Sequence, residues 1–410
     1  MATTADKPAV SRGLAIFTGF LVTTLEGYDL QVISSASLQL RQTMGLTESQ
    51  TGIFFSATLI GLAIGALVGG WLGDRYGRKP TLIWSTVILG VFTFASALVN
   101  NYEGLLITRI LAGIGLGGAM PTLIAIIAEV SGGKNTTSAV TTMICGHPAG
   151  GIISALVGKT IAETYGWQSL FIVGGVLTLM VIPMIIKYLP ETKGPMHGAG
   201  SKAMPAGKAI FGEGRAASSI LLWTIFILTL ALLSTLLSWT PTLIQGMGLD
   251  RSVQLNSVIA LNVGGILGSL FISRAIDRVG MRWPLLFLYA TIAVGLYFFA
   301  HAESATMLLI LAGVVGFGVL GAQFSLYGVA PRLYPMEGRS AGVGAAVAIG
   351  RLGSIFGPIL IGGYLQRGAS VDQAVLVMAP VAIAAGLALF ALTVTSRDAL
   401  RAKPVAAPQQ

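Results

Sequence analysis

Long apolar segments follow one another along almost the whole chain, each separated from the next by a short polar stretch. A helix needs about 20 apolar residues to cross the hydrocarbon core of a bilayer. Twelve segments reach this length, at residues 13–36, 51–72, 81–99, 104–128, 137–160, 167–189, 219–245, 253–273, 283–301, 304–328, 340–364 and 373–395. The pattern predicts an all-α integral membrane protein with twelve transmembrane helices.

The polar stretch after the sixth segment, residues 190–218, is longer than the others. It is rich in Gly and Lys, the composition of a flexible connector between two folded parts. We therefore expect an N-terminal six-helix bundle at 13–189 and a C-terminal six-helix bundle at 219–395. Residues 1–12 and 396–410 are expected to be polar tails.

A short basic signature closes the second apolar segment and returns at the end of the eighth. Residues 70–79 read G-W-L-G-D-R-Y-G-R-K, and residues 273–282 read S-R-A-I-D-R-V-G-M-R. Their aspartates, Asp74 and Asp277, lie 203 positions apart (277 − 74). The sequence I-L-A-G at residues 110–113 also recurs at 310–313. These echoes predict a parallel duplication, and therefore two pseudo-symmetric bundles.

Charge limits the partners of the chain. Charged residues make up only 10% of it, against about 25% in globular domains, so we expect the lipid bilayer around it. The formal net charge is +9, but the basic residues form short runs between apolar segments rather than one basic face, which argues against nucleic acid. Most Lys and Arg fall on the side of the two tails, so both termini are expected in the cytoplasm, with the chain as a multi-pass protein of a bacterial-type inner membrane.

Residues that could carry metal or redox chemistry are few. Cys145 is the single cysteine, and the three histidines are far apart in the sequence, so no metal-ligand spacing is present. No nucleophile–base pair or cofactor loop is visible either. We expect no metal, no cofactor, no enzymatic activity and a monomeric protein.

The signature at residues 70–79 resembles the loop motif of the major facilitator superfamily, and the layout of six plus six segments is similar over nearly the whole chain. The sequence R-x-x-x-G-x-G-x-G-G from Arg109 resembles the superfamily's fourth-helix motif, and P-E-T-K-G at 190–194 resembles an end-of-half signature. The resemblance implies the major facilitator fold, in which transport proceeds by alternating access of two bundles.

Within the superfamily, E-G-Y-D from Glu26 to Asp29 resembles a motif of the aromatic acid:proton symporters. Together with residues 327–331, 339–344 and 350–353, and with Glu where Asp is more usual, it is most similar to the 3-hydroxyphenylpropionate transporters. This resemblance implies proton-coupled import of an aromatic carboxylic acid, such as 3-(3-hydroxyphenyl)propionate or a similar phenolic acid. The alternative is a proton antiporter that exports drugs or metabolites.

Three ionisable residues are expected at one depth in the N-terminal bundle. At 1.5 Å per residue, Glu26 and Asp29 lie about 20–24 Å up the first segment, and Arg109 lies about 8 Å down the fourth from the opposite side. Two acids on one helical face repel when both are ionised, which favours a bound proton. We interpret the three as a proton-coupling site, with Arg109 also a candidate for binding substrate. The alternative is a permanent salt bridge to Arg109 that only joins helices.

Other polar and aromatic residues are candidates for substrate binding. Arg351 lies near the midplane with no acid in its own segment, so its planar guanidinium suits the substrate carboxylate; alternatively it pairs with Glu26 or Asp29. His147 could accept a proton, touch substrate or be a packing residue. Since the seventh and tenth helices line the cavity in the resembling fold, candidates for the aromatic ring are Trp239, Gln323 and Tyr327.

The two basic signatures are candidates for gating. In the superfamily the first loop latches the two halves, which implies that Asp74 pairs across the bundle and that Arg78 meets a carboxylate, for which Glu129 is available. Gly77 makes the tight turn possible. The remaining members of the predicted gating set are Arg75, Asp277 and Arg278. The alternative is that these residues only signal topology, and the second signature, with Ser273 and Met281, departs from the pattern.

Overall fold

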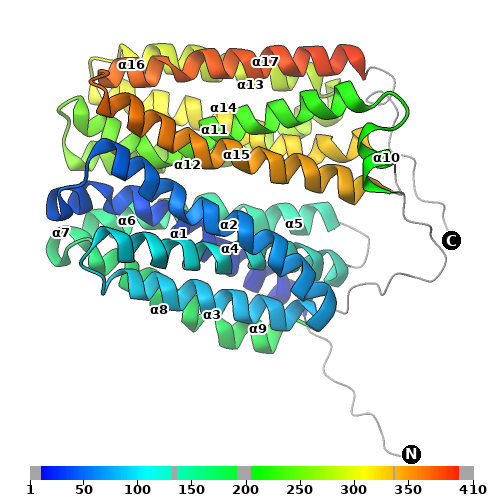
Figure 1. Ribbon diagram of the computed structural model, residues 1–410, viewed down its shortest axis with the longest axis horizontal. Coiled ribbons are helices and arrows are strands. Elements are labelled where there is room, and N and C mark those ends of the chain that lie inside the picture. Colours follow the sequence, from blue (N-terminus) through cyan, green and yellow to red (C-terminus); the bar gives the residue numbers. More distant parts are fainter. Residues whose placement is uncertain (1–10, 132–135, 192–204, 336–337, 397–410) are drawn as a thin grey trace, which may run out of the picture. The chain divides into compact units, whose positions relative to one another are not determined.

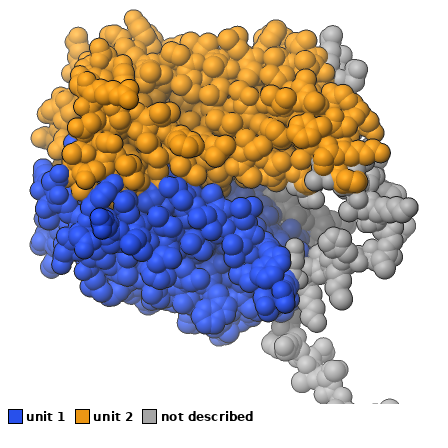
Figure 2. Space-filling model, in the orientation of Figure 1, with its two compact units in different colours: residues 1–45, 57–196 blue, residues 46–56, 197–410 orange. Residues whose placement is uncertain are grey.

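A computed structural model describes residues 11–131, 136–191, 205–335 and 338–396. Every element in these ranges is a helix, and all peptide bonds there are trans. The chain divides into two compact units (Figures 1 and 2). Unit 1 comprises residues 1–45 and 57–196, and unit 2 comprises residues 46–56 and 197–410.

Unit 1 contains most of α2 and eight further helices in its described part. The elements are α1 (Arg12–Met44), α2 (Glu48–Tyr76), α3 (Arg78–Ser96), α4 (Tyr102–Val130), α5 (Thr136–Ile144), α6 (Gly146–Thr160), α7 (Ala162–Tyr165), α8 (Gln168–Met180) and α9 (Ile182–Tyr188).

Unit 2 begins with the first turns of α2, up to residue 56. Its other described elements are α10 (Ala206–Phe211), α11 (Ala216–Gly246), α12 (Arg251–Val279), α13 (Arg282–Ala300), α14 (Ala305–Val329), the 3₁₀ helix η1 (Ala330–Leu333), α15 (Arg339–Gln366), α16 (Val371–Leu376) and α17 (Met378–Thr395).

Eleven segments of the described chain are long and apolar enough to cross a membrane. The first predicted segment falls on α1, which is long enough but carries many polar residues and is not among the eleven. The prediction that this segment ends at residue 36 is wrong, because α1 continues to Met44 and is closed by Gly45 at a φ of 64°. Three predicted segments are each split into two helices, after Ile144, Met180 and Leu376, and a proline follows each break within four residues. Proline lacks the N–H that continues a helix.

Glycines bring the helix backbones close together in each unit. A Cβ added at Gly61 or Gly65 of α2 would overlap a carbonyl of α4, and the same holds for Gly264 and Gly268 of α12 against α14. The carbonyls belong to Ile110 and Ile114 in unit 1, and to Gly313 and Phe317 in unit 2. Each unit 2 residue stands 203 positions after its counterpart. Because dispersion contacts rather than water expulsion hold helices together in lipid, small residues are placed where backbones meet.

The I-L-A-G echo does not belong to this duplication. Its two copies are 200 positions apart (310 − 110), whereas the packing places Gly316, not Gly313, in the position of Gly113. Gly113 lies against the Thr58 carbonyl and Gly316 against the Leu261 carbonyl, and both pairs are offset by 203. The echo is therefore out of register with the structural repeat, and the prediction that it marks the duplication is wrong.

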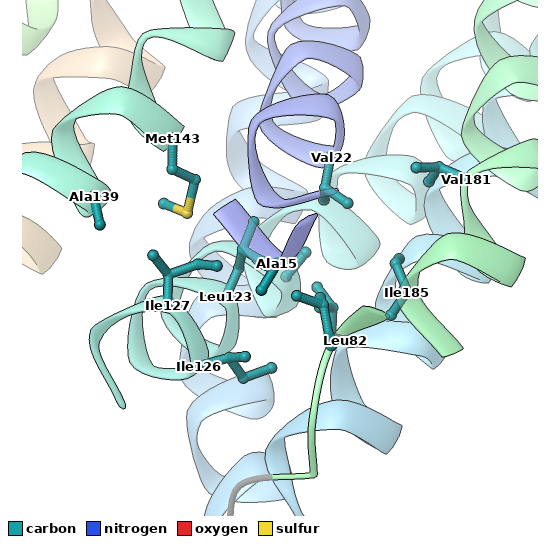
Figure 3. Close-up of a cluster of buried hydrophobic side chains, with 12 residues drawn as sticks. Ala15, Val22, Leu82, Leu123, Ile126, Ile127, Ala139, Met143, Val181 and Ile185 are labelled. Atoms are coloured by element: carbon teal, nitrogen blue, oxygen red, sulfur yellow. The ribbon is translucent and has the colours of Figure 1, made fainter. Parts of the chain in front are cut away.

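A cluster of buried apolar side chains holds one end of α1 in unit 1 (Figure 3). Ala15 and Val22 of α1 meet Leu82 of α3, Leu123 of α4 and Ile185 of α9. All five are at most 2% exposed. Since Val22 is one turn before Glu26, this packing fixes the rotation of α1 at the point where its acidic residues begin.

Candidate functional site

The acidic stretch of α1 is held by close backbone contacts on either side of it. A Cβ at Gly27 would overlap the His147 carbonyl of α6, and one at Gly150 would overlap the Thr24 carbonyl. The Tyr28 hydroxyl donates a hydrogen bond to the Leu170 carbonyl of α8 at 2.8 Å. These contacts leave Glu26 and Asp29 little freedom to rotate about the helix axis.

Asp29 and Arg109 form a buried bidentate ion pair. Arg109 Nη1 lies 3.0 Å from Asp29 Oδ1, and Nη2 lies 2.5 Å from Oδ2. The two side chains are 0% and 1% exposed. Such a planar, charge-assisted arrangement is the geometry in which arginine binds a carboxylate most strongly.

Three further side chains complete the surroundings of the ion pair. Arg109 Nε donates to the Thr58 hydroxyl of α2 at 3.1 Å, and the Thr93 hydroxyl of α3 donates to Asp29 Oδ1 at 2.5 Å. The guanidinium lies over the Phe171 ring of α8, 5.6 Å from its centre. Five helices of unit 1 therefore meet at this ion pair, and the desolvated charges are compensated by hydrogen bonds.

Glu26 is buried beside this pair but does not join it. Its side chain is 1% exposed, and neither carboxyl oxygen has a hydrogen-bond partner within the described residues. The residue lines a narrow crevice with mainly apolar walls, among them Val22, Leu89 and Val181. A carboxylate without a partner is costly in such surroundings, whereas a carboxylic acid costs far less. The structure thus brings together two of the three predicted residues and leaves the third unpartnered.

His147 is half-buried in the first turn of α6. Its backbone is a packing element, because the carbonyl faces Gly27. Close to the break before α6, the Thr23 hydroxyl of α1 donates a hydrogen bond to the Met143 carbonyl at 2.5 Å. This bond links α1 to the end of α5.

Arg351 is half-buried on α15 of unit 2, and no hydrogen bond or ion pair holds its guanidinium in the described part of the chain. The predicted alternative, a pair of Arg351 with Asp29 or Glu26, would join residues of two different units and stays a prediction. Within unit 1, Asp29 is bound by Arg109, and the Glu26 oxygens accept no hydrogen bond from the described residues. One turn further along α15, the Ile355 carbonyl accepts a hydrogen bond from Ser56 at 2.6 Å.

The three residues proposed to contact an aromatic ring differ in their surroundings. Trp239 is fully buried, donates its indole N–H to the Pro358 carbonyl at 3.1 Å and stands edge-on against Phe55. These contacts favour a packing role for Trp239 over substrate binding. Tyr327 on α14 has its ring against Phe226 of α11, with 5.7 Å between ring centres.

Gln323 of α14 is the unusual member of this set. It is 2% exposed, and neither its amide oxygen nor its amide nitrogen has a partner among the described residues. A buried amide normally has hydrogen bonds, because leaving it without one costs about 1–3 kcal/mol. Gln323 is thus a buried polar group to which a ligand could supply the missing partner.

The first basic signature places its charges at one end of unit 1. Arg78, at the start of α3, pairs with Glu129 near the end of α4. Gly77 between α2 and α3 has a φ of 102°, a conformation that favours glycine. The side chain of Asp74 lies outside the described residues.

The second signature has the same turn but not the same ion pair. Gly280 has a φ of 82°, whereas the residues 203 positions after Arg78 and Glu129 are Met281 and Arg332. Arg278 is exposed, and the side chain of Asp277 lies outside the described residues. The ion pair of unit 1 therefore has no equivalent at these two positions of unit 2, because the uncharged Met281 stands in the place of Arg78.

Sequence reasoning did not find Thr58, Thr93 or Phe171. Threonine hydroxyls in membrane helices usually bond to the preceding turn, and Thr93 lies in an otherwise apolar segment, so nothing in the sequence marks it as a ligand of Asp29. The single weak signal is that Thr58 and Arg109 lie on two helices that glycine patterns predict to be in contact. No cluster of three potential metal ligands occurs among the described residues.

Comparisons with known proteins agree with this fold. The family model for the Major Facilitator Superfamily matches residues 19–268 and 253–409. The 3-(3-hydroxyphenyl)propionate transporter of Escherichia coli is 36% identical over 373 residues, covering 91% of this chain and 92% of the relative. The 4-hydroxybenzoate transporter PcaK of Pseudomonas putida is 31% identical over 372 residues, covering 82% and 83%.

A solved structure, that of the nucleoside transporter NupG, superposes with a TM-score of 0.77 over 93% of this chain and 99% of its own, at 14% identity. At that identity the likeness supports the fold alone. The predicted fold class and the resemblance to 3-hydroxyphenylpropionate transporters are confirmed by these matches. The chain therefore belongs to the major facilitator superfamily, and both sequence relatives named above are transporters of aromatic acids.

Proposed function

We propose that this protein is a proton-coupled symporter that imports an aromatic carboxylic acid, 3-(3-hydroxyphenyl)propionate or a similar phenolic acid, across the inner membrane. Both termini lie in the cytoplasm in this proposal, as the placement of basic residues favours. The observation that carries it is Glu26, a buried carboxyl group without a partner one turn from a fully paired Asp29. The names of the relatives support the class of substrate.

Proton coupling has a physical reason. Importing a monoanion against a negative interior costs about 2.3 kcal/mol per 100 mV, and one co-transported proton cancels that charge. Glu26 is the carrier in this proposal, because Asp29 already accepts hydrogen bonds from Arg109 and Thr93. The ion pair stays beside Glu26 in one access state, and its rearrangement exposes Glu26 to the other side of the membrane.

Unit 2 supplies the groups for the organic substrate. Arg351, which has no anionic partner within the described residues, binds the carboxylate in the proposal. Gln323 offers both a donor and an acceptor to a phenolic hydroxyl. Tyr327 is retained as a ring contact and His147 as a polar neighbour, whereas Trp239 is not.

Gating is assigned to the first basic signature. The Arg78–Glu129 pair and the turn at Gly77 hold the ends of α2, α3 and α4 in one arrangement. We expect the pair to favour one of the two access states, with Asp74 and Arg75 in the same loop. The corresponding positions of unit 2, with Asp277 and Arg278, lack this ion pair.

The test is substrate-driven proton movement in proteoliposomes that contain a pH-sensitive dye. Adding 3-(3-hydroxyphenyl)propionate to one side should carry protons in the direction of the substrate in the wild type. In Glu26→Gln the added substrate should carry no protons with it. The control variant Glu163→Gln, which changes an exposed residue, should behave like the wild type. Proton movement opposite to the substrate would establish the antiporter instead, and unchanged co-movement in Glu26→Gln would remove the proposed carrier.

A further inference from the structure

A groove of about 510 Å³ runs along the outside of unit 1 between α2 and α3, with α4 as its floor. Its lining includes small residues from all three helices: Gly65 and Gly69 of α2, Ser85 of α3 and Gly118 of α4. The walls are large and exposed: the side chains of Trp84 and Tyr76 are 67% and 61% exposed. This combination is a narrow channel with an apolar lining, open along one side.

In the inference drawn here the groove faces lipid. All three helices are long and apolar enough to cross the membrane, and every residue that lines the groove belongs to unit 1. Along α2 the groove extends from Gly65 to Tyr76, about 16 Å at 1.5 Å per residue. That is about half of a hydrocarbon core of about 30 Å, which matches one leaflet and therefore one acyl chain.

A cation stands at the polar end of the groove. The guanidinium of Arg75 lies 5.2 Å from the ring centre of Trp71 and 5.4 Å from that of Tyr76, and Tyr76 lines the groove. Arg78 in the same turn is paired with Glu129. The Arg75 side chain is exposed, so a phosphate can approach its guanidinium.

Unit 2 differs at the equivalent place. The residues 203 positions after Gly69 and Ser85 are Ile272 and Leu288, which are 5% and 0% exposed. At Gly321, the counterpart of Gly118, an added Cβ would meet Leu288 Cδ1 at 3.4 Å, so the leucine occupies the volume above this floor. The duplicated helices thus have bulky side chains in unit 2 where unit 1 has the groove.

We propose that this groove binds an anionic glycerophospholipid, with one acyl chain between α2 and α3 and the phosphate at Arg75. The small floor admits the chain, the aromatic walls contact it, and the length of the groove matches one leaflet. Charge complementarity selects an anionic headgroup, since each basic residue near anionic lipid contributes about 1 kcal/mol. The inference does not depend on the transported substrate.

Native mass spectrometry of the purified full-length protein, titrated with phosphatidylglycerol or phosphatidylcholine, tests the proposal. We expect one tightly bound phosphatidylglycerol, weaker binding of phosphatidylcholine, and about fivefold weaker phosphatidylglycerol binding in Arg75→Gln. Arg278→Gln, the same position of the repeat without a groove beside it, is the matched control and should bind like the wild type. Equal loss in both arginine variants, or equal affinity for the two lipids, would overturn the headgroup assignment.

Two variants test the acyl-chain position. Ser85→Leu introduces the leucine that unit 2 has at this position. It should abolish binding of the one tightly bound phosphatidylglycerol. Should that variant not fold, Val68→Trp narrows the groove from its exposed wall, and Leu67→Trp next to it is the control. Unchanged lipid binding in the folded groove variants would refute the site, as would dimers that dissociate when the groove is filled, because a second copy would then be the occupant.

Discussion

Unit 1 keeps a buried ion pair at positions where unit 2 is apolar. Counting 203 positions on, Asp29 and Arg109 correspond to Leu232 and Ala312, while the two supporting threonines, Thr58 and Thr93, correspond to Leu261 and Leu296. The register is secure, since Gly150 lies against the Thr24 carbonyl and Gly353 against the Ile227 carbonyl at the same offset. The two units therefore share their packing and differ in their chemistry.

Two polar residues of unit 2 correspond to apolar residues of unit 1. Arg351 of unit 2 corresponds to Pro148, and Gln323 corresponds to Met120. Close glycine contacts are constrained by helix geometry and persist in both copies, whereas side chains that face the interior are free to diverge. We therefore assign the proton-carrying residue to unit 1 and the residues that recognise the substrate to unit 2.

The largest expected effect comes from breaking the ion pair. Arg109→Ala leaves Asp29 buried without its counter-ion and should lower the free energy of unfolding by about 3–5 kcal/mol. The double variant Asp29→Leu/Arg109→Ala installs the residues of unit 2 and should recover stability to within about 1 kcal/mol, because an apolar pair needs no charge compensation. Denaturant unfolding in detergent measures both. A double variant as unstable as the single one would contradict the equivalence of the two units.

A smaller effect is expected at the proposed carboxylate anchor. Arg351→Gln removes a hydrogen bond to a charged group and should weaken binding of the aromatic acid by about 2 kcal/mol, roughly thirtyfold. Equilibrium binding of the labelled acid to purified protein checks this, with the exposed Arg367→Gln directly after the same helix as control. Unchanged affinity would move the anchor out of unit 2 and onto Arg109.

Gln323 tests whether unit 2 determines the preference for a phenolic substrate. Gln323→Leu should reduce the preference for 3-(3-hydroxyphenyl)propionate over 3-phenylpropionate by about fivefold, since a neutral hydrogen bond contributes about 1 kcal/mol. Competition between the two acids for the labelled substrate gives this ratio. Met120→Leu, at the corresponding position of unit 1, should leave it unchanged. The same loss in both variants would show that the effect is one of packing.

The smallest effect is expected at the Arg78–Glu129 pair, whose side chains are 15% and 38% exposed. Glu129→Gln should lower stability by no more than about 1 kcal/mol, and less at high salt, because water and ions screen the charges. The charge swap Arg78→Glu/Glu129→Arg should restore the unfolding midpoint. A swap that stays as destabilised as the single variant would mean that the pair contributes through geometry rather than charge.

Much of the fold followed from the sequence because membrane helices must be long, apolar and internally hydrogen-bonded. The repeated turn around Gly77 and Gly280 also had a sequence signal, since charge, spacing and a positive φ coincide there. The helix breaks at Cys145 and Val377 did not, because a proline predicts a disturbance without saying whether the helix bends or stops.

The site was predictable only in part. Depth counting placed Asp29 and Arg109 at one level, and the structure joins them. Counting residues cannot give the rotation of a helix, so it could not tell that Glu26 is left without a partner or that Trp239 is enclosed by Phe55 and Pro358. Those outcomes depend on which helix approaches each face.

The most direct test of the account compares two assays on Glu26→Gln in the same proteoliposomes. The first is accumulation of labelled 3-(3-hydroxyphenyl)propionate driven by an imposed pH gradient, and the second is counterflow of the same acid without a gradient. The account predicts that accumulation is lost while counterflow continues, because the variant still alternates and still binds the acid but carries no exchangeable proton. Accumulation at the wild-type level would contradict it.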